Sequence, residues 1–496
     1  MPNQQQAKFV NGSIMRHITV MSTSGAVGLM ALFLVDLADM FFISLLGQVE
    51  LAAAIGFAGT IVFFSTSVSI GTSIAMGALV SRALGSGKRE EARKLTGSIM
   101  VFAAIVSVLT VGVILLFIDP ILTSIGAQGE AAQKAKDFLV ILLPGAPLMA
   151  MGMSAGAALR GVGDAKLSMA ATLISGAVNA ILDPIFIFGL SMGIEGAATA
   201  SLISRFVLFG VAFHAVHRKH DLVARPTFAD LSHHFSAIIH IAGPAIVTNT
   251  ATPIGNAIVT AQIAKFGSDY VAGYAVMGRL LPVSFALIFS LSGAVGPILG
   301  QNYGAQKFDR VQQTLSDSVK FVTAYCVVVA LILFLAQGFI IDAFSLDGDA
   351  ASMVTLFCTY IAITFIFNGT LFVSNAAFNN LNRPTWSTLL NVGKATLGTM
   401  PFVYVGGHLG GAEGVLIGQA VGSVLFGIAG YILVKKLIVQ LARDHEQKED
   451  DVVAIEPAVP VTAFSSYRTV MAEESEGAIE SDTKDTDKKD GNENKH

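Results

Sequence analysis

The chain has 496 residues, of which 53% are hydrophobic and only 13% are charged, and its mean hydropathy is +0.66. Because a soluble protein carries about 25% charged residues, this composition excludes an ordinary soluble enzyme and indicates a polytopic membrane protein. The formal net charge of −4 combines a slightly basic body with an acidic tail, since residues 446–496 hold 14 acids and 6 bases. The charge balance gives no reason to expect nucleic acid as a partner.

Twelve apolar segments are each long enough to cross a bilayer, which takes about 20 residues in a helix. Clusters of Gly, Pro or charged residues separate them, as in SRALGSGKREEARK (81–94). The expected transmembrane helices are 17–46, 51–80, 95–118, 133–158, 167–190, 196–217, 236–265, 271–299, 318–341, 351–378, 387–406 and 414–437. The sequence therefore predicts an all-α integral membrane protein.

Lys and Arg gather in every second connection between these helices. The connections around 81–94, 160–166 and 218–225 are basic, whereas the connections between them are nearly free of Lys and Arg. Since basic loops stay on the cytoplasmic side, both termini are expected in the cytoplasm. We therefore expect a multi-pass membrane protein of this orientation.

The chain also repeats itself. GALVSRALGSGKREEARKLTGS (77–98) aligns with GPILGQNYGAQKFDRVQQTLSDS (296–318). Further along the chain, DPIFIFG (183–189) resembles MPFVYVGG (400–407). Each repeat holds six predicted helices, and an even number returns the chain to the same side of the membrane. The repeats therefore predict two parallel lobes related by a pseudo-twofold axis, with substrate bound between them.

The repeat and the charge pattern together define the expected organisation of the chain. It comprises a cytoplasmic N-terminus (1–16), an N-lobe (17–217), a cytoplasmic inter-lobe loop (218–235), a C-lobe (236–437) and a cytoplasmic tail (438–496). The tail is acidic, poor in aromatic residues and without a clear period, so we expect it to be disordered.

Acidic residues within the apolar segments are the strongest functional signal. An acid at the centre of a bilayer costs about 2.5–3.5 kcal/mol on insertion scales and usually marks an ion pathway. Counting about 1.5 Å per residue from the outer helix ends places Asp39 and Asp183 at the same depth. Asp36 and Asn179 lie one turn deeper on the same helix faces, and Ser201 stands near the outer end of the next helix.

These five residues form the predicted ion-coupling site. Carboxylate, amide and hydroxyl oxygens are hard donors, so Asp39, Asn179, Asp183 and Ser201 suit Na⁺ and can equally hold a proton. No organic cofactor is expected beside this H⁺ or Na⁺. Two alternatives remain: the acids are protonated and only pack, or Asp183 caps a helix after a break.

Two basic residues of the second half, Lys394 and Arg279, are candidates for a substrate cavity, although Lys394 also fits a snorkelling side chain. The loop LGSGKRE (84–90) lacks the spacing of a phosphate-binding loop. No catalytic motif is present, and Cys326 and Cys358 lie in apolar segments as small hydrophobes. We therefore do not expect an enzyme.

Three segments resemble signatures of the multidrug and toxic compound extrusion (MATE) transporters. VDLADMFFISLLGQVELAAAIGFA (35–58) is similar to their helix 1–2 pattern, with Asp39 on the family Asp and Asp36 as an additional acid. GAVNAILDPIFIFG (176–189) resembles the helix 5 pattern of the DinF-like branch. GAATASLIS (196–204) resembles the helix 6 pattern, with Ser201 for the usual Thr. The resemblance covers about residues 15–440.

Two positions depart from the family pattern. Thr252 stands where the NorM-like and eukaryotic branches carry a Glu, so their second-lobe carboxylate chemistry is not expected here. The first predicted helix also lacks the Pro at which DinF-like transporters bend it.

The resemblance implies a secondary active efflux antiporter that exports amphipathic, often cationic compounds in exchange for H⁺ or Na⁺. Its partners would be small amphipathic substrates and membrane lipids, and we expect a monomer. The alternative is a flippase for lipid-linked saccharides with a related two-lobe architecture. A flippase should show more helices or a strongly basic cavity.

Overall fold

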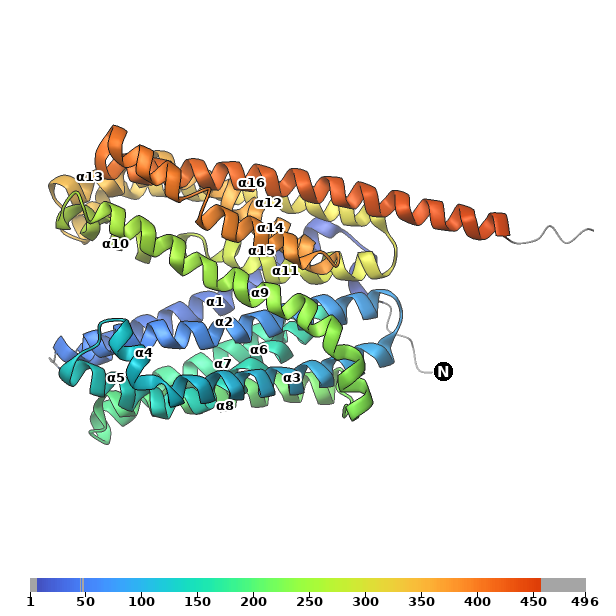
Figure 1. Ribbon diagram of the computed structural model, residues 1–496, viewed down its shortest axis with the longest axis horizontal. Helices are drawn as coiled ribbons and strands as arrows, with labels where there is room; N and C mark the ends of the chain where they lie inside the picture. The colour runs from blue at the N-terminus through green and yellow to red at the C-terminus, as the bar shows by residue number, and fades with distance from the viewer. Residues whose placement is uncertain (1–6, 45, 47–48, 456–496) are drawn as a thin grey trace, which may run out of the picture. The chain divides into compact units, whose positions relative to one another are not determined.

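The computed structural model describes residues 7–44, 46 and 49–455, and a few side chains within them, including Asp36 and Thr252, lie outside the description (Figure 1). The α-helices are α1 (Ile14–Ser44), α2 (Val49–Gly85), α3 (Arg89–Leu116), α4 (Ile118–Ser124), α5 (Gly129–Leu142), α6 (Ala146–Gly161), α7 (Ala165–Pro184), α8 (Gly193–His214), α9 (Phe228–Ile263), α10 (Ser268–Ser284), α11 (Ala286–Gly304), α12 (Phe308–Ala343), α13 (Gly348–Leu356), α14 (Phe365–Asn380), α15 (Pro384–Ala395) and α16 (Met400–Ile455).

Short 3₁₀ and π segments join several of these helices. They are η1 (Lys8–Val10), η2 (Leu143–Gly145), η3 (Ile185–Gly189), η4 (Ala215–Lys219), η5 (Phe357–Ile361) and η6 (Ala362–Thr364). The described residues contain no strand. The predicted all-α fold class is therefore confirmed.

The predicted spans are occupied by helices. By length and composition, nine helical stretches of the described chain can cross a membrane, or ten when α10 and α11, which meet at 45°, count as one bent span. One of the nine, Pro384–Gln447, covers two predicted spans, which the non-helical Gly410 and Gly411 separate. Most of the predicted span 236–265 falls in α9 (Phe228–Ile263), which is not among those nine or ten.

Figure 1 shows α1–α8, in blue to green, on one side of residues 1–438, and α10–α15, in green to orange, on the other. The first half has two apolar cores. One joins α2, α3, α6 and α8 through residues such as Met76, Ile99 and Leu159, and the other joins the start of α2 to α3–α6 through residues such as Ala54 and Leu139. Buried Ala and Gly let these helices approach closely, as is usual where helices pack within a membrane.

The two halves share a turn that recurs at the predicted repeat positions. Lys88 precedes α3 with φ −89° and ψ 66°, and Lys307 precedes α12 with φ −91° and ψ 72°. The residues just before them, Gly87 and Gln306, both have positive φ. A second pair of positive-φ residues, Gly163 and Asn382, stands in the turns before α7 and α15. The backbone thus confirms the repeat at the first pair of turns, and it shows a second repeated turn, at Gly163 and Asn382, that sequence comparison missed.

The two halves cross at the ends of α2 and α11. A Cβ atom on Gly85 would lie 2.1 Å from the carbonyl oxygen of Gln301, and one on Gly304 would lie 2.2 Å from that of Arg82. Gly85 corresponds to Gly304 in the repeat, and Arg82 corresponds to Gln301. The contact is therefore self-complementary, as expected around a twofold axis, and both positions require glycine.

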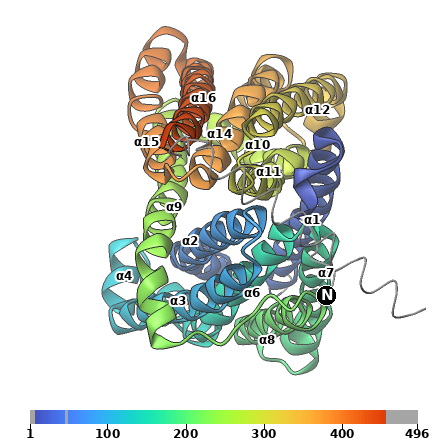
Figure 2. The same cartoon turned by 90° about the vertical axis from the view of Figure 1, so that its right-hand side faces the viewer.

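The first helix of each half packs across to the other half. Helix α1 contacts α7 of its own half and α11 of the second half, while α9 contacts α15 of its own half and α2 of the first. Figure 2 shows α1 between α7 and α11. A shift of α1 against α7 therefore also changes its fit against the opposite half.

The residues before α1 connect the two halves. Phe9 is 1% exposed, its N–H donates to Gln301 Oε1 at 2.8 Å, and its carbonyl accepts from Arg310 Nη2 at 2.9 Å. Lys8 Nζ donates to the carbonyl of Gly163 in the first half at 2.6 Å. Within the predicted N-terminus, the segment around Lys8 and Phe9 is thus part of the contact between the halves.

Two predicted boundaries differ from the structure. The predicted inter-lobe loop ends early, because α9 begins at Phe228 with a capping box between Thr227 and Asp230. The tail, predicted to be disordered from residue 438, is helical as far as Ile455, because residues 435–447 are rich in strong helix formers. Residues 439–496 form a separate unit, and residues 456–496 lie outside the described chain.

Candidate functional site

Three of the five predicted ion-coupling residues meet where α1 packs against α7. The Asn179 amide Nδ2 donates to Asp183 Oδ2 at 2.7 Å and lies 3.4 Å from Asp39 Oδ1. Asp183 is fully buried, Asn179 is 5% exposed and Asp39 is half-buried. One amide thus bridges two carboxyl groups from different helices.

The local sequence explains why the two helices come so close. A Cβ atom on Gly176 of α7 would lie 3.2 Å from Val35 Cγ2 of α1, so a larger residue would push the helices apart. Asn179 and Asp183 follow Gly176 by three and seven residues, and Asp39 follows Val35 by four. These spacings keep the polar side chains on the helix faces that touch.

Asp183 lies inside α7 rather than at a helix start, so the alternative that it caps a helix is wrong. The next residue, Pro184, has no backbone N–H and weakens the hydrogen bonding of this turn. The π segment η3 follows directly, and such segments are frequent at functional sites. The backbone around Asp183 is therefore irregular next to the carboxyl pair.

One atom of the cluster lacks a partner. Asp183 Oδ1 is buried and accepts no hydrogen bond from a described donor group, while the carboxyl group of Asp183 also interacts with that of Asp39. Leaving a buried acceptor unpaired costs about 1–3 kcal/mol, and more when the group is charged. A proton or a small cation bound at this oxygen would remove that penalty, so the arrangement is chemically suited to bind one.

The remaining two predicted members are not part of this contact as described. Ser201 on α8 is half-buried, and within the described chain its hydroxyl forms no hydrogen bond to Asp39, Asn179 or Asp183. The side chain of Asp36 lies outside the described residues. The site that the structure describes therefore consists of Asp39, Asn179 and Asp183.

The two predicted cavity residues of the second half, Lys394 and Arg279, differ in burial and in hydrogen bonding. Lys394 on α15 is half-buried and donates from Nζ to Asn368 Oδ1 on α14. Among the described residues it forms no ion pair. Arg279 on α10 is exposed, and no described residue hydrogen-bonds to it. No contact brings Lys394 and Arg279 together.

Sequence reasoning missed several polar side chains that connect helices. Arg205 on α8 donates from Nη1 to the carbonyl of Leu142 at 2.9 Å. Gln301 donates from Nε2 to the carbonyl of Gly161 at 2.7 Å and so joins the two halves. The signal that could have found Gln301 was the repeat, because it stands three residues before the repeated Gly304.

Comparisons with known proteins place the chain in a family. The MatE family model matches residues 26–185 and 244–405, which together make up more than half of the chain. A protein from Shewanella oneidensis described as "FAD transporter" is 28% identical over 438 residues, covering 86% of this chain and 96% of that protein. "Multidrug export protein MepA" of Staphylococcus haemolyticus is 24% identical over 458 residues, covering 89% and 99%.

Solved structures agree with this family. The crystal structure of a mutant of the Vibrio cholerae MATE transporter VcmN has a TM-score of 0.82 and 25% identity, covering 86% of this chain and 97% of that one. A MOP superfamily transporter from Pyrococcus furiosus has a TM-score of 0.81 at 22% identity, covering 88% and 98%, which shows the shared fold. The architecture is that of a multi-pass membrane transporter.

Proposed function

Because this chain belongs to the MatE family, whose members are transporters rather than enzymes, we propose that it is a secondary active exporter driven by entry of H⁺ or Na⁺. The observation that carries this proposal is the carboxyl pair of Asp39 and Asp183 around the Asn179 amide, with Asp183 Oδ1 unpaired. A buried acid without a full set of partners is a group that gains from binding a cation.

The contacts of α1 support a way to couple the ion to transport. An ion entering from outside binds between Asp39 and Asp183 and removes the need of these carboxyl groups for hydration. Helix α1 then packs more closely on α7, and its contact with α11 changes at the same time. This change alters the arrangement of the halves, so the cavity between them closes and substrate leaves outward.

The available driving force is adequate for such a cycle. One proton moving across 100 mV supplies about 2.3 kcal/mol. This energy corresponds to roughly a fifty-fold concentration gradient of a neutral substrate. The return to the inward-facing arrangement releases the ion into the cytoplasm.

Two substrate classes have support. The relative described as a multidrug export protein favours amphipathic, often cationic compounds. The relative described as an FAD transporter favours an anionic aromatic compound. Lys394 is a specific observation for the second class, because its ammonium group is half-buried and, within the described chain, has an amide oxygen rather than a carboxylate as partner. Arg279 remains a candidate for the same cavity.

Transport in everted membrane vesicles tests the proposal. Uptake of a cationic dye and of a flavin nucleotide is measured under three conditions. These are fixed pH with Na⁺, fixed pH without Na⁺, and a proton gradient without Na⁺. We expect one substrate class to accumulate only when the coupling ion can flow, and Asp39→Asn to abolish this dependence. The matched control is Asp137→Asn, a half-buried acid of α5 outside the site. Ion-dependent uptake that survives in Asp39→Asn contradicts the proposed coupling. If the vesicles take up neither the dye nor the flavin nucleotide but translocate lipid-linked sugars, the result supports the flippase instead.

The proposed location is the cytoplasmic membrane of a bacterium with both termini in the cytoplasm. The basic connections at 81–94 and 218–225 support this orientation. In that orientation the crossing of α2 and α11 and the segment around Phe9 lie on the cytoplasmic side. The described arrangement then joins the halves at their cytoplasmic end.

A further inference from the structure

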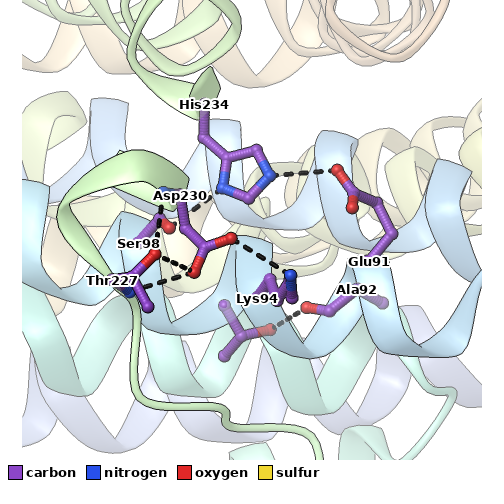
Figure 3. Close-up of polar contacts among 8 residues, drawn as sticks. Glu91, Ala92, Lys94, Ser98, Thr227, Asp230 and His234 are labelled. Carbon is purple, nitrogen blue, oxygen red and sulfur yellow. Dashed lines mark hydrogen bonds and ion pairs between the residues drawn. The ribbon is translucent and has the colours of Figure 1, made fainter. Parts of the chain in front are cut away.

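A second polar cluster, separate from Asp39 and its partners, lies where α3 meets the start of α9. Glu91 of α3 and His233 and His234 of α9 each offer one metal-ligand atom, and these atoms lie within 4.8 Å of one another. Figure 3 shows His234 pointing from α9 toward Glu91 on α3, with Ser98 on its other side. The two histidines lie outside the ranges that the family model matches, 26–185 and 244–405, and the transport proposal uses none of the three residues.

The central imidazole of the cluster is held in a fixed orientation. The His234 side chain is 4% exposed, its Nε2 lies 3.0 Å from Glu91 Oε1, and its Nδ1 lies 2.9 Å from Ser98 Oγ. Glu91 and the exposed His233 are open to solvent. One ligand atom is therefore buried and oriented, and two can adjust to an incoming ion.

The backbone that carries the two histidines is also anchored. Thr227 and Asp230 form the capping box of α9, and Lys94 of α3 pairs with Asp230 at 3.2 Å. Hydrogen bonds from the Thr227 hydroxyl and backbone N–H, together with Lys94, hold the pKa of Asp230 well below its ordinary value. The charge of Lys94 is thus balanced by Asp230 and does not oppose a cation beside Glu91 (Figure 3).

We propose that Glu91, His233 and His234 bind a divalent first-row transition metal ion, with Zn²⁺ the best match. Two imidazole nitrogens and one carboxylate oxygen are a donor set that zinc uses, and three protein ligands leave a fourth position for water. The Ser98 hydroxyl supplies the outer hydrogen bond that orients a metal-bound histidine.

Metal binding requires small local changes that the cluster allows. Ligand atoms about 2.0–2.2 Å from one zinc ion lie closer together than the 4.8 Å within which the three atoms are found here, and the exposed His233 side chain is free to adjust to the ion. His234 binds through Nε2 as a neutral imidazole. Its proton stays on Nδ1, and this N–H donates a hydrogen bond to the Ser98 hydroxyl oxygen. The bound ion then connects the start of α9, which carries the two histidines, to α3.

Zinc titration of the purified full-length protein, free of any affinity tag, tests the proposal. We expect one saturable site per chain by calorimetry, and visible absorption typical of tetrahedral Co²⁺ when Co²⁺ replaces Zn²⁺. His233→Ala and Glu91→Gln should each weaken binding about tenfold or more, the loss typical of damage to a metal site. His240→Ala removes another exposed histidine of α9 and should leave the affinity unchanged.

The choice of variants keeps the test independent of folding. His233 is exposed, so its replacement leaves the buried His234 contacts intact, and thermal unfolding without metal should match that of the unsubstituted protein. The unsubstituted protein should in addition unfold at a higher temperature with Zn²⁺, whereas His233→Ala should not. Absence of saturable binding, or equal affinity in His233→Ala, overturns the proposal and leaves His234 and Glu91 as a structural hydrogen-bonded pair only.

Discussion

At the scale of single residues, the Asp39–Asn179–Asp183 cluster combines burial with incomplete hydrogen bonding. Asn179 donates to both carboxyl groups, but Asp183 Oδ1 receives nothing within the described chain. A purely structural site would be expected to pair every buried polar atom. Other buried side-chain atoms of the described chain, such as Ser107 Oγ and Asn379 Oδ1, also lack a partner, so the proposed ion exchange rests on the meeting of two carboxyl groups and is tested by substitution.

Substitutions at Asn179 and Asp183 should separate stability from coupling. Asn179→Ala removes the donor to Asp183 and should lower the free energy of unfolding by about 1–3 kcal/mol. Asp183→Asn replaces a buried acid by a neutral amide that cannot exchange a proton or bind a cation by charge, and should leave thermal stability equal or higher, while ion-dependent transport is lost. Thermal unfolding in detergent and vesicle transport measure the two effects. Strong destabilisation by Asp183→Asn would point to a packing role instead.

A second residue-scale prediction concerns Asp164, in the turn before α7 and outside the membrane-spanning segments. Partial burial would raise its pKa, but hydrogen bonds from Lys219 and His220, both at 3.1 Å, and from the Leu167 N–H outweigh this and lower it. A lowered folded-state pKa gives stability that is present above the unfolded pKa and is lost as pH falls through the folded pKa. Asp164→Asn should flatten the acid side of the stability profile, measured by unfolding temperature against pH. Asp119→Asn, in an exposed ion pair with Lys136, is the control and should leave the profile unchanged.

At the scale of helices, the crossing of α2 and α11 depends on two glycines that the repeat relates. An added Cβ at either position would meet a backbone carbonyl oxygen, which cannot move like a side chain. Close backbone approach at small residues is how helices associate in membranes. The geometry therefore explains why Gly85 and Gly304 correspond in the two halves.

Gly85→Ala and Gly304→Ala should each disrupt this crossing and reduce transport strongly. The matched control is Gly77→Ala on the same helix α2, because no atom lies within 4 Å of its added Cβ. A Gly-to-Ala change inside a helix by itself favours the helix by about 1 kcal/mol, so a loss at Gly85 reports the clash. Transport rate and unfolding temperature are the measurements, and equal behaviour of Gly85→Ala and Gly77→Ala would contradict the prediction.

At the scale of the whole molecule, the repeat relates two halves that are not chemically equivalent. Asp183 and Pro184 align with Met400 and Pro401, so the second half keeps the Pro but has no acid at this position. The proposed ion site therefore belongs to the first half only. The contacts of α1 and the segment around Phe9 connect that half to the other.

The segment around Phe9 should stabilise the arrangement in which the halves meet at α2 and α11. Phe9→Ala removes a buried aromatic ring, a change that costs about 3–5 kcal/mol in a packed core, and should shift the molecule away from this arrangement. Labelling of an engineered Ser81→Cys, buried at the crossing, by a thiol reagent on that side should increase. The native Cys326 and Cys358 are buried and give little background. Arg16→Ala, an exposed position on α1, should leave the labelling rate unchanged.

Local sequence was sufficient to predict the helical fold, most of the spans and the proximity of Asp39, Asn179 and Asp183. Apolar length predicts a membrane helix because unpaired backbone groups are too costly in lipid, and the helical period fixes which residues share a face. The same reasoning did not predict that Ser201 makes no hydrogen bond to the cluster, since depth along a helix does not give the direction of a side chain on a neighbouring helix.

Sequence by itself determined the class of protein, its repeat and the helix faces that carry its acids, because these follow from composition and helix geometry. Only the tertiary structure decided that Asp183 keeps an unpaired oxygen, that Gly85 and Gly304 touch the opposite half, and that Glu91 meets His233 and His234. Each of these contacts joins residues on different helices. Their distances depend on how the helices pack, and no local pattern contains that information.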